Sequence, residues 1–267
     1  MTGFKTAVSE VGDGWVSIRG YRHDEIIGRV PAASATFLTL VGRLPTDAEA
    51  RLVDAMLTSL LDHGFVAATV AAARYAASGN PQLVPAVAAG LLAAGQNTLS
   101  PEHAYELIAE ARELRAANGW DDQRTAAAIV ERARAQGRRL PGFGHPVHRG
   151  TDFRATVLFE LADDLGLAGD ASSLYRAIHA EFVRESGKEE IPINIDGCLA
   201  CLGMDIGLSA SQTVAIALLA VLPGLMAHVI EEIEDGVPLR YIENGSYVGE
   251  SERPLPGVAT AQEGAAR

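Results

Sequence analysis

The sequence predicts an all-α protein, on three observations. Apolar residues recur at three-to-four spacing along most of the chain, which is the period of an amphipathic helix. Several of these stretches begin at a capping residue or an N-terminal proline and end at glycine, as helices do. Alternation of apolar and polar residues with a period of two, which would indicate a β-strand, is hard to find. The best strand candidate is residues 191–195, where Pro192 argues against a strand.

The expected helices follow one another in chain order with short breaks. Thr46 and the acidic turn after it indicate the start of a helix, and Ser100-Pro101 indicates the start of another. Gly137 stands where a helix ends in a left-handed residue. Residues 249–267 hold proline, glycine, alanine and charge, so we expect a loose tail. The expected helices cover residues 47–64, 66–77, 81–94, 101–119, 121–136, 152–165, 172–186 and 209–232.

Composition limits the function. The 267 residues weigh 28.1 kDa, are 48% hydrophobic, and fit one large domain or two modest ones. Lys and Arg number 22 against 34 Asp and Glu, a net charge of −12, so nucleic acid and anionic membranes are poor partners. No signal peptide is evident and the cysteines suggest no disulfide scaffold, so we expect a reducing, cytoplasmic location.

Two apolar features have competing interpretations. Cys198 and Cys201 are spaced C-x-x-C, but a zinc ribbon needs a second pair, and the apolar neighbours favour buried thiols over a redox or metal site. Residues 214–230 are as apolar as a membrane span. They are short for one, contain Pro223 and His228, and run into acidic residues, so a buried core helix is the better interpretation.

Two long non-helical segments carry most of the polar chemistry. In residues 138–152, glycines allow close approach of a ligand and arginines surround His145. This segment is either an anion pocket or a turn with solvated arginines. In residues 187–197, Asp196 follows an apolar run that would raise its pKa, which suits a general acid or base. The alternative is that Asp196 caps the next helix.

Motifs of several other enzyme classes are absent. The chain has no H-E-x-x-H, no second cysteine pair, no G-x-G-x-x-G after an expected strand, no G-x-x-x-x-G-K-[ST] and no G-x-S-x-G. The sequence therefore predicts no metal site, no dinucleotide cofactor and no serine hydrolase chemistry.

Three motifs occur in a fixed order along the chain. Residues 62–64 read DHG, residues 141–149 read PGFGHPVHR with TDFR at 151–154, and residues 193–197 read INIDG. Together they resemble the D-H-G, P-G-x-G-H-x-V, D-P-R and N-V-D-G stretches of the citrate synthase superfamily. The resemblance is nearest to its short citryl-CoA lyase branch, which includes the C-terminal module of ATP-citrate lyase.

The resemblance implies a citrate synthase-like fold. A large helical domain would comprise residues 1–98 and 203–267, a smaller CoA-binding helical domain residues 99–202, and the active-site cleft would lie between them. Residues 19–28 look like helices near the N-terminus of that family. The partners implied are an acyl-CoA, a 2-oxo acid and a second copy of the chain in a homodimer. Besides the CoA thioester that serves as substrate, no cofactor is needed.

The resemblance also implies a carbon–carbon lyase that cleaves citryl-CoA, or a related 3-hydroxy-acyl-CoA, to acetyl-CoA and oxaloacetate. His145 would contact the C3 hydroxyl as it becomes a ketone, Asp196 would exchange a proton with the acetyl methyl carbon, and His63 would hold the thioester oxygen of the enolate. Arg154 and Asn194 would bind the acid part of the substrate. The CoA-binding residues would be Pro141, Gly142, Phe143, Gly144, Arg149 and Lys188.

Two positions depart from the family pattern. Thr98 stands where full-length citrate synthases carry a histidine; the lyase branch also lacks it, although a one-turn slip could bring in His103. Val221 stands where an arginine grips a substrate carboxylate, so either Arg240 compensates or the substrate carries fewer carboxylates. Two alternatives therefore stay open: a small citrate or alkylcitrate synthase, and a degenerate homologue that binds an acyl-CoA without turnover.

Overall fold

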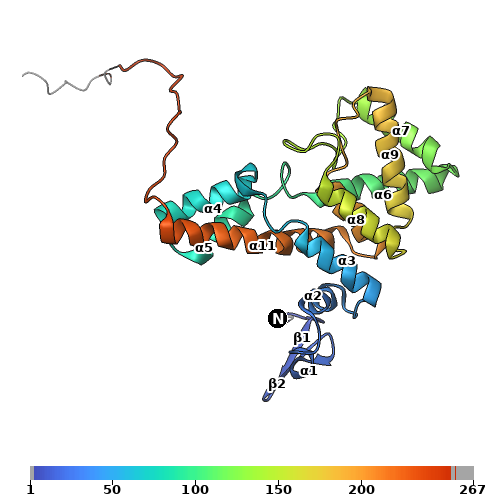
Figure 1. Cartoon of the computed structure of the whole chain (residues 1–267), viewed down its shortest axis with the longest axis horizontal. Helices are drawn as coiled ribbons and strands as arrows, with labels where there is room; N and C mark the ends of the chain where they lie inside the picture. Colours follow the sequence, from blue (N-terminus) through green and yellow to red (C-terminus); the bar gives the residue numbers. More distant parts are fainter. Residues whose placement is uncertain (1–2, 254–255, 257–267) are drawn as a thin grey trace, which may run out of the picture.

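The computed structural model describes residues 3–253 and 256, and within them helices dominate (Figure 1). This confirms the predicted all-α fold class. Residues 249–253 and 256 of the expected loose tail contain no helix or strand, and the rest of that tail lies outside the described residues. The elements are β1 (Ser9–Gly12), β2 (Trp15–Ile18), β3 (Tyr21–Arg22), α1 (His23–Ile26), α2 (Ala32–Val41), α3 (Asp47–Thr58), η1 (Gly64–Val66), α4 (Ala68–Gly79), α5 (Leu83–Leu92), α6 (Pro101–Asn118), α7 (Asp122–Ala135), α8 (Phe153–Asp164), α9 (Asp170–Ser186), α10 (Ile195–Asp205) and α11 (Ala210–Asp235).

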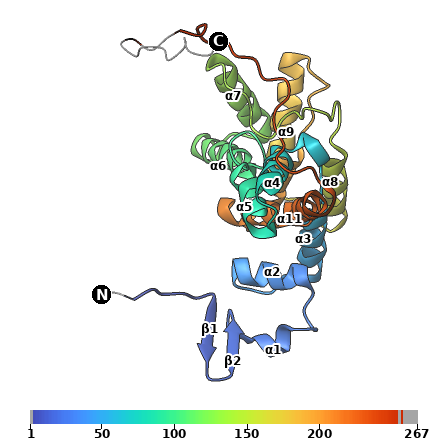
Figure 2. The ribbon, with the colours of Figure 1, turned by 90° about the vertical axis from the view of Figure 1, so that its left-hand side faces the viewer.

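A small sheet near the N-terminus corrects one expectation. Residues 19–28 were expected to be helical, but only α1 is, and β1, β2 and β3 form an antiparallel sheet before it. Asp13 and Gly14, with φ of 73° at the glycine, make the hairpin turn, a sequence signal that the helical interpretation missed. Figure 2 shows this sheet and α1 beyond α2, away from the main helical body.

The predicted helices are present with shifted ends. Thr46 caps α3 in a capping box: its hydroxyl accepts from the backbone N–H of Glu49, and the Glu49 carboxylate accepts from that of Thr46. This helix stops at Thr58 instead of near Gly64, which frees the chain around His63 to adopt an irregular path. Similarly, Ser209 caps α11 with a capping box.

The core is built around α10. This helix packs against α6, α8, α9 and α11, and most of its residues are fully buried. Figure 1 shows α6, α7, α8 and α9 gathered at one end of the molecule, while α4 and α5 lie along the C-terminal part of α11 at the other. The division into domains at residues 98/99 and 202/203 stays a prediction.

Helix α11 is long and apolar enough to cross a membrane by length and composition alone. In the structure it contacts α3, α4, α5, α6 and α10, and one of its faces lies in the core. Glu232 near its C-terminal end is also buried, paired with two arginines. A core helix passes the same test of length and hydropathy as a membrane span.

The two cysteines are buried thiols, as predicted. Cys198 and Cys201 lie one turn apart in α10, both with no exposed surface and without a disulfide. Burial raises the pKa of both thiols well above the usual range. They therefore act as small apolar residues of the core.

The strand candidate at residues 191–195 does not form a strand. One isolated bridge joins Ile193 to Phe143, and Ile195 already begins α10. Pro192 cannot donate a ladder hydrogen bond, but its carbonyl accepts one from the backbone of Gly144 at 2.8 Å. The segment therefore supports the His145 loop.

Candidate active site

His63 lies in the irregular turn between α3 and η1. Its neighbour Asp62 accepts from the backbone N–H of Gly64 at 3.0 Å and pairs with Nε2 of His228, on α11, at 3.1 Å. Because these contacts tie the turn to α11, the backbone on either side of His63 is held in place. His228 therefore has a supporting role.

The loop that carries His145 is hydrogen-bonded to the segment before α10. Asn194 donates from its backbone N–H to the carbonyl of Gly142 and from Nδ2 to that of Gly144, both at 2.8 Å. Its Oδ1 accepts from the backbone N–H of Gly197 and caps α10. Asn194, expected to bind substrate, thus has both ends of its amide engaged with the protein.

Gly142 shows why this loop needs glycine. It has a φ of 79°, and a Cβ there would collide with the hydroxyl of Tyr175 and lie 2.7 Å from the Cα of Gly197. Tyr175 in turn donates to the carbonyl of Pro141 at 2.8 Å. The backbone therefore passes close to α9 and α10, and His145 is presented from a tightly packed loop.

His63 and His145 are brought into direct contact across the fold. Their Nε2 atoms lie 3.2 Å apart. The Nδ1 atom of His145 accepts from the backbone N–H groups of Val147 and His148, each at 3.1 Å, so it carries no proton. In the neutral ring the proton of His145 is therefore on Nε2, which donates to Nε2 of His63. The proton of a neutral His63 is then on Nδ1.

Both histidines are shifted toward the neutral form. Burial, together with the charges of Arg154 and His148, lowers the pKa of His145 to about 4. Burial also lowers the pKa of His63, and the same two groups contribute. The pair is therefore uncharged at neutral pH, with one N–H donor and one lone pair meeting at the contact.

A third imidazole completes the cluster. The ring of His148 lies 4.4 Å from that of His145 and 5.2 Å from that of His63, measured between centroids. Sequence reasoning did not assign His148 to the site. The spacing of the two histidines in GHPVH was the available signal, because a proline turn between them folds the second back on the first.

The three histidines have the spacing of a metal site, with one nitrogen of each lying within 4.8 Å of the others. The tautomer of His145 does not fit that use. A coordinating nitrogen must present a lone pair, whereas Nε2 of His145 keeps its proton because two backbone groups donate to Nδ1. The cluster is arranged to donate and accept protons.

Asp196 lies in the first turn of α10, where its Oδ2 accepts from the backbone N–H of Ser100 at 3.2 Å. The interpretation of Asp196 as a helix cap is wrong, because Asn194 has that role. Burial raises the pKa of Asp196, and the neighbouring carboxylate of Glu102 adds to the rise. The side chain is thus biased toward the proton-carrying form.

Arg154 is a buried cation beside these groups. Its Nε and Nη2 donate to the two oxygens of Asp152 at 2.9 and 2.7 Å. Its positive charge lowers the pKa of His63, His145 and Asp196 alike. Arg154 therefore places one positive charge close enough to affect all three groups.

Asp152 is a supporting residue that sequence reasoning missed. Burial would raise its pKa, but the bonds from Arg154 outweigh that effect and lower it. Besides holding Arg154, it accepts from the backbone N–H of Ile195 at 3.1 Å. Asp152 therefore fixes the start of α8 to the start of α10.

The residues expected to bind CoA fall into two groups. Pro141, Gly142 and Phe143 are packed into the fold; the ring of Phe143, for example, meets the ring of His179 edge-on at 4.9 Å. The segments carrying Arg149 and Lys188 are exposed and adjacent, because Gly150 donates to the carbonyl of Glu190 at 2.8 Å. Gly144, which has a φ of 87°, lies in the chain between the packed group and Arg149.

Arg240 is not free to replace the missing arginine within the described chain. Its Nε and Nη2 donate to the buried carboxylate of Glu232 at 2.6 and 3.0 Å. Val221 packs partly buried against the main core. His103 and Thr98 are not members of the histidine cluster, and the backbone of Thr98 forms a tight turn with Gly95.

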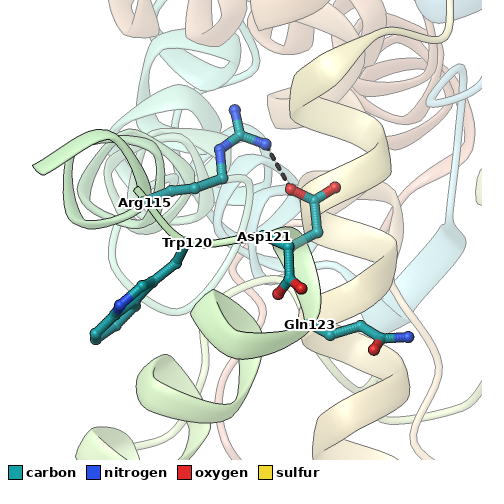
Figure 3. Close-up of a pocket in the computed structure, with 5 residues that line it drawn as sticks. Arg115, Trp120, Asp121 and Gln123 are labelled. Carbon is teal, nitrogen blue, oxygen red and sulfur yellow. Dashed lines mark hydrogen bonds and ion pairs between the residues drawn. The ribbon is translucent and has the colours of Figure 1, made fainter. Parts of the chain in front are cut away.

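A surface hollow lies at the junction of α6 and α7, and none of the three clustered histidines lines it (Figure 3). Arg115, Trp120 and Gln123 are among its lining residues. Arg115 is paired with Asp122 and Asp170, so its charge is satisfied. The hollow has the paired, solvated groups of an ordinary surface, whereas the histidine cluster has perturbed and unpaired ones.

Comparisons with known proteins identify the family of this chain. The sequence model described as "Citrate synthase, C-terminal domain" matches residues 4–242. A citrate synthase from Acidithiobacillus ferridurans is 25% identical over 233 residues, which are 85% of this chain but 58% of that protein. The chain thus spans less than two thirds of the length of this curated relative.

Two solved structures are similar in fold. A citryl-CoA lyase from Hydrogenobacter thermophilus superposes with a TM-score of 0.85 at 30% identity, covering 95% of this chain and 97% of the other. A citrate synthase from Thermoplasma acidophilum, solved with carboxymethyl coenzyme A and oxaloacetate, gives a TM-score of 0.69 at 24% identity, covering 88% of this chain and 60% of the other. The match to the family over most of its length shows that this chain belongs to the citrate synthase family.

Proposed function

We propose that this protein is a carbon–carbon lyase that cleaves citryl-CoA, or a closely related 3-hydroxy-acyl-CoA, to acetyl-CoA and oxaloacetate. The observation that carries the proposal is the likeness to a citryl-CoA lyase at 30% identity over nearly the whole of both chains. The protonation of the site supports the same direction of reaction.

Cleavage needs a base at the C3 hydroxyl and an acid at the carbon that becomes the acetyl methyl group. The lone pair on Nε2 of His63 is suited to take the hydroxyl proton, and Nε2–H of His145 to stabilise the oxygen as the bond breaks. The electron pair of the broken bond forms the enolate of acetyl-CoA. Asp196 then donates its proton to the enolate carbon, and the charge of His63 and Asp196 is reset through solvent.

This scheme changes the role of His63 from the one expected from the sequence. There, His145 alone acted on the hydroxyl and His63 held the thioester oxygen. The contact between the two Nε2 atoms favours a shared role at one oxygen, with His63 as the proton acceptor. It also leaves the thioester oxygen to groups other than these two nitrogens.

The directions of the pKa shifts of His63 and Asp196 support cleavage over condensation. Condensation would start from a protonated His63 and an ionised Asp196, whereas burial lowers the pKa of the histidine and raises that of the carboxyl group. Cleavage starts from the neutral histidine and the protonated acid, the forms that burial favours. Arg154 would hold a substrate carboxylate, and Arg149 and Lys188 the phosphates of CoA.

A citrate synthase is the second candidate. The curated citrate synthase from Acidithiobacillus ferridurans favours it, although that protein is considerably longer than this chain. A synthase would use the same groups in the opposite protonation states and would release free CoA. We further propose a cytoplasmic homodimer that needs no cofactor other than the CoA of its substrate.

The test is to mix the purified protein with citryl-CoA and follow oxaloacetate through malate dehydrogenase and NADH, while chromatography identifies the CoA product. The proposal predicts oxaloacetate and acetyl-CoA in equal amounts, and a loss of about 10³-fold in Asp196→Asn. Citrate and free CoA would identify a synthase. A folded protein that binds CoA and forms neither product pair would be a binding homologue.

A further inference from the structure

His148 is the imidazole of the cluster that the proposed reaction leaves unused. Its ring stacks on that of His63 at an interplanar angle of 26°, and Phe153 meets its other side edge-on at 5.5 Å. Its backbone N–H donates to Nδ1 of His145. These contacts fix both the position of His148 and its orientation relative to the catalytic pair.

The Nε2 atom of His148 is buried and has no hydrogen-bond partner among the described residues. Buried polar atoms without a partner are rare in native proteins because each leaves its desolvation uncompensated. The atom does not lie in a packing defect of the core, but beside two imidazoles of the site. An unpaired ring nitrogen in that place indicates a hydrogen-bond partner that arrives with the substrate.

The spacing of the cluster suits one oxygen atom. When three nitrogens lie within 4.8 Å of one another, a point exists about 2.8 Å or less from each, which is a normal hydrogen-bond distance. In the free protein the Nε2 atoms of His63 and His145 are in contact with each other. A substrate oxygen that separates the pair would meet His148 as well.

The chemistry selects which oxygen this is. Arg154 is suited to a carboxylate, which offers two oxygens to a guanidinium. Three nitrogens that can all reach one oxygen suit instead the C3 oxygen. Negative charge develops on this oxygen as the carbon–carbon bond breaks or forms. On the basis of the proposed function, we propose that His148 is a third catalytic imidazole, which donates from Nε2 to the oxygen that becomes the ketone of oxaloacetate.

Two variants test the donor directly. His148→Leu keeps the bulk of the ring but removes the donor, and His148→Gln retains an N–H group. His23→Leu is the matched control, because His23 is exposed in α1, distant in sequence from the cluster. Each protein is mixed with citryl-CoA, and each is also bound to oxaloacetate labelled with ¹³C at the ketone carbon, whose chemical shift reports hydrogen bonding to the ketone oxygen.

We expect His148→Leu to lower kcat by about 10²-fold with little change in KM for citryl-CoA, as when an oxyanion donor is removed. The ketone carbon of bound oxaloacetate moves less far downfield than in the wild type. His148→Gln recovers part of both effects, and His23→Leu changes neither.

A wild-type ketone shift in His148→Leu would overturn the role of His148, as would an equal loss of kcat in the leucine and glutamine variants. The proposed function fails separately, if the wild type releases no oxaloacetate from citryl-CoA. If the wild type also binds no oxaloacetate, both are overturned.

Discussion

The Nε2 atoms of His63 and His145 lie 3.2 Å apart although 82 residues separate them in the chain. The two backbone donors on Nδ1 of His145 decide the direction of this contact, because they leave Nε2 of His145 as the donor and Nε2 of His63 as the acceptor. Two histidines that look alike in the sequence thus have different chemistry in the fold.

Because His63 accepts and His145 donates at this contact, we expect replacement by glutamine to affect the two residues differently. His63→Gln removes the lone pair that accepts a proton but keeps an amide, and we expect kcat for cleavage to fall about 10³-fold. His145→Gln can still donate through its amide N–H, so its kcat falls about tenfold. Steady-state kinetics with citryl-CoA checks both values, and equal losses would contradict the assignment of acceptor and donor.

Glu102 is predicted to tune the proton of Asp196. It lies in the first turn of α6, its Oε2 is buried without a partner in the described chain, and its charge contributes to the raised pKa of Asp196. Glu102→Gln removes that charge, so the pKa of Asp196 falls and cleavage loses rate at neutral pH but not at the acid end of its profile.

The matched control is Glu106→Gln, which changes an exposed carboxylate on the next turn of the same helix. Its pH–rate profile should superpose on that of the wild type. If Glu102→Gln gave the wild-type profile too, Glu102 would have no part in setting the proton of Asp196.

Glu232 is predicted to stabilise the fold. Its carboxylate is buried and accepts from Arg74 at 2.7 Å and from Arg240 at 2.6 and 3.0 Å. Glu232→Gln leaves two arginines without their common partner, and we expect the free energy of unfolding to fall by about 3 kcal/mol. Glu231→Gln removes an exposed carboxylate beside Arg74 and should cost less than about 1 kcal/mol.

Urea denaturation measures both variants. Burial would raise the pKa of Glu232, but the bonds from its two arginines outweigh this and lower it. Its contribution to stability is therefore present above the pKa of an unfolded glutamate, and is lost as the pH falls through the folded value. An unfolding free energy in Glu232→Gln within error of that in Glu231→Gln would show that the buried pairing adds nothing.

Two substitutions can separate the cost of a steric clash at position 142 from the cost of a positive φ angle. Gly142 and Gly150 have similar φ angles, 79° and 74°, but a Cβ at 142 meets Tyr175 and Gly197, while one at 150 meets no atom within 4 Å. Gly150→Ala should therefore cost about 1–2 kcal/mol of conformational strain. Gly142→Ala adds a steric clash, so we expect a further loss of several kcal/mol, measured as a lower midpoint in urea.

The helices and the site segments could be predicted from the sequence because their signals are local. The cap at Thr46, the glycines that end helices and the apolar spacing each act within a few residues. The hairpin around Asp13 was missed because its strands are four residues or fewer, too short for alternation to be recognised. The position of Asn194 as the helix cap depended on where α10 begins, which the sequence leaves uncertain by a residue or two.

The contacts within the site could not be predicted in the same way. Whether Arg240 is free depends on Glu232, and the tautomer of His145 depends on backbone donors that only the folded loop presents. His148 was not assigned to the site from the sequence, and the lack of a partner for its buried Nε2 depends on how the folded loop packs it beside His63 and His145. The sequence motifs indicated that His63 and His145 belong to one site. Only the folded structure determines which of their nitrogens donates.

The pH dependence of cleavage tests the central claim most directly. If neutral His63 takes the hydroxyl proton and protonated Asp196 supplies the other, kcat/KM for citryl-CoA rises as His63 loses its proton, below its ordinary pKa of 6.5, because burial lowers that value. It then falls as Asp196 ionises, above the ordinary 3.8, because burial raises that value. The account predicts a bell whose rising limb belongs to His63 and whose falling limb belongs to Asp196, and a rate that instead climbs to a plateau without falling would contradict it.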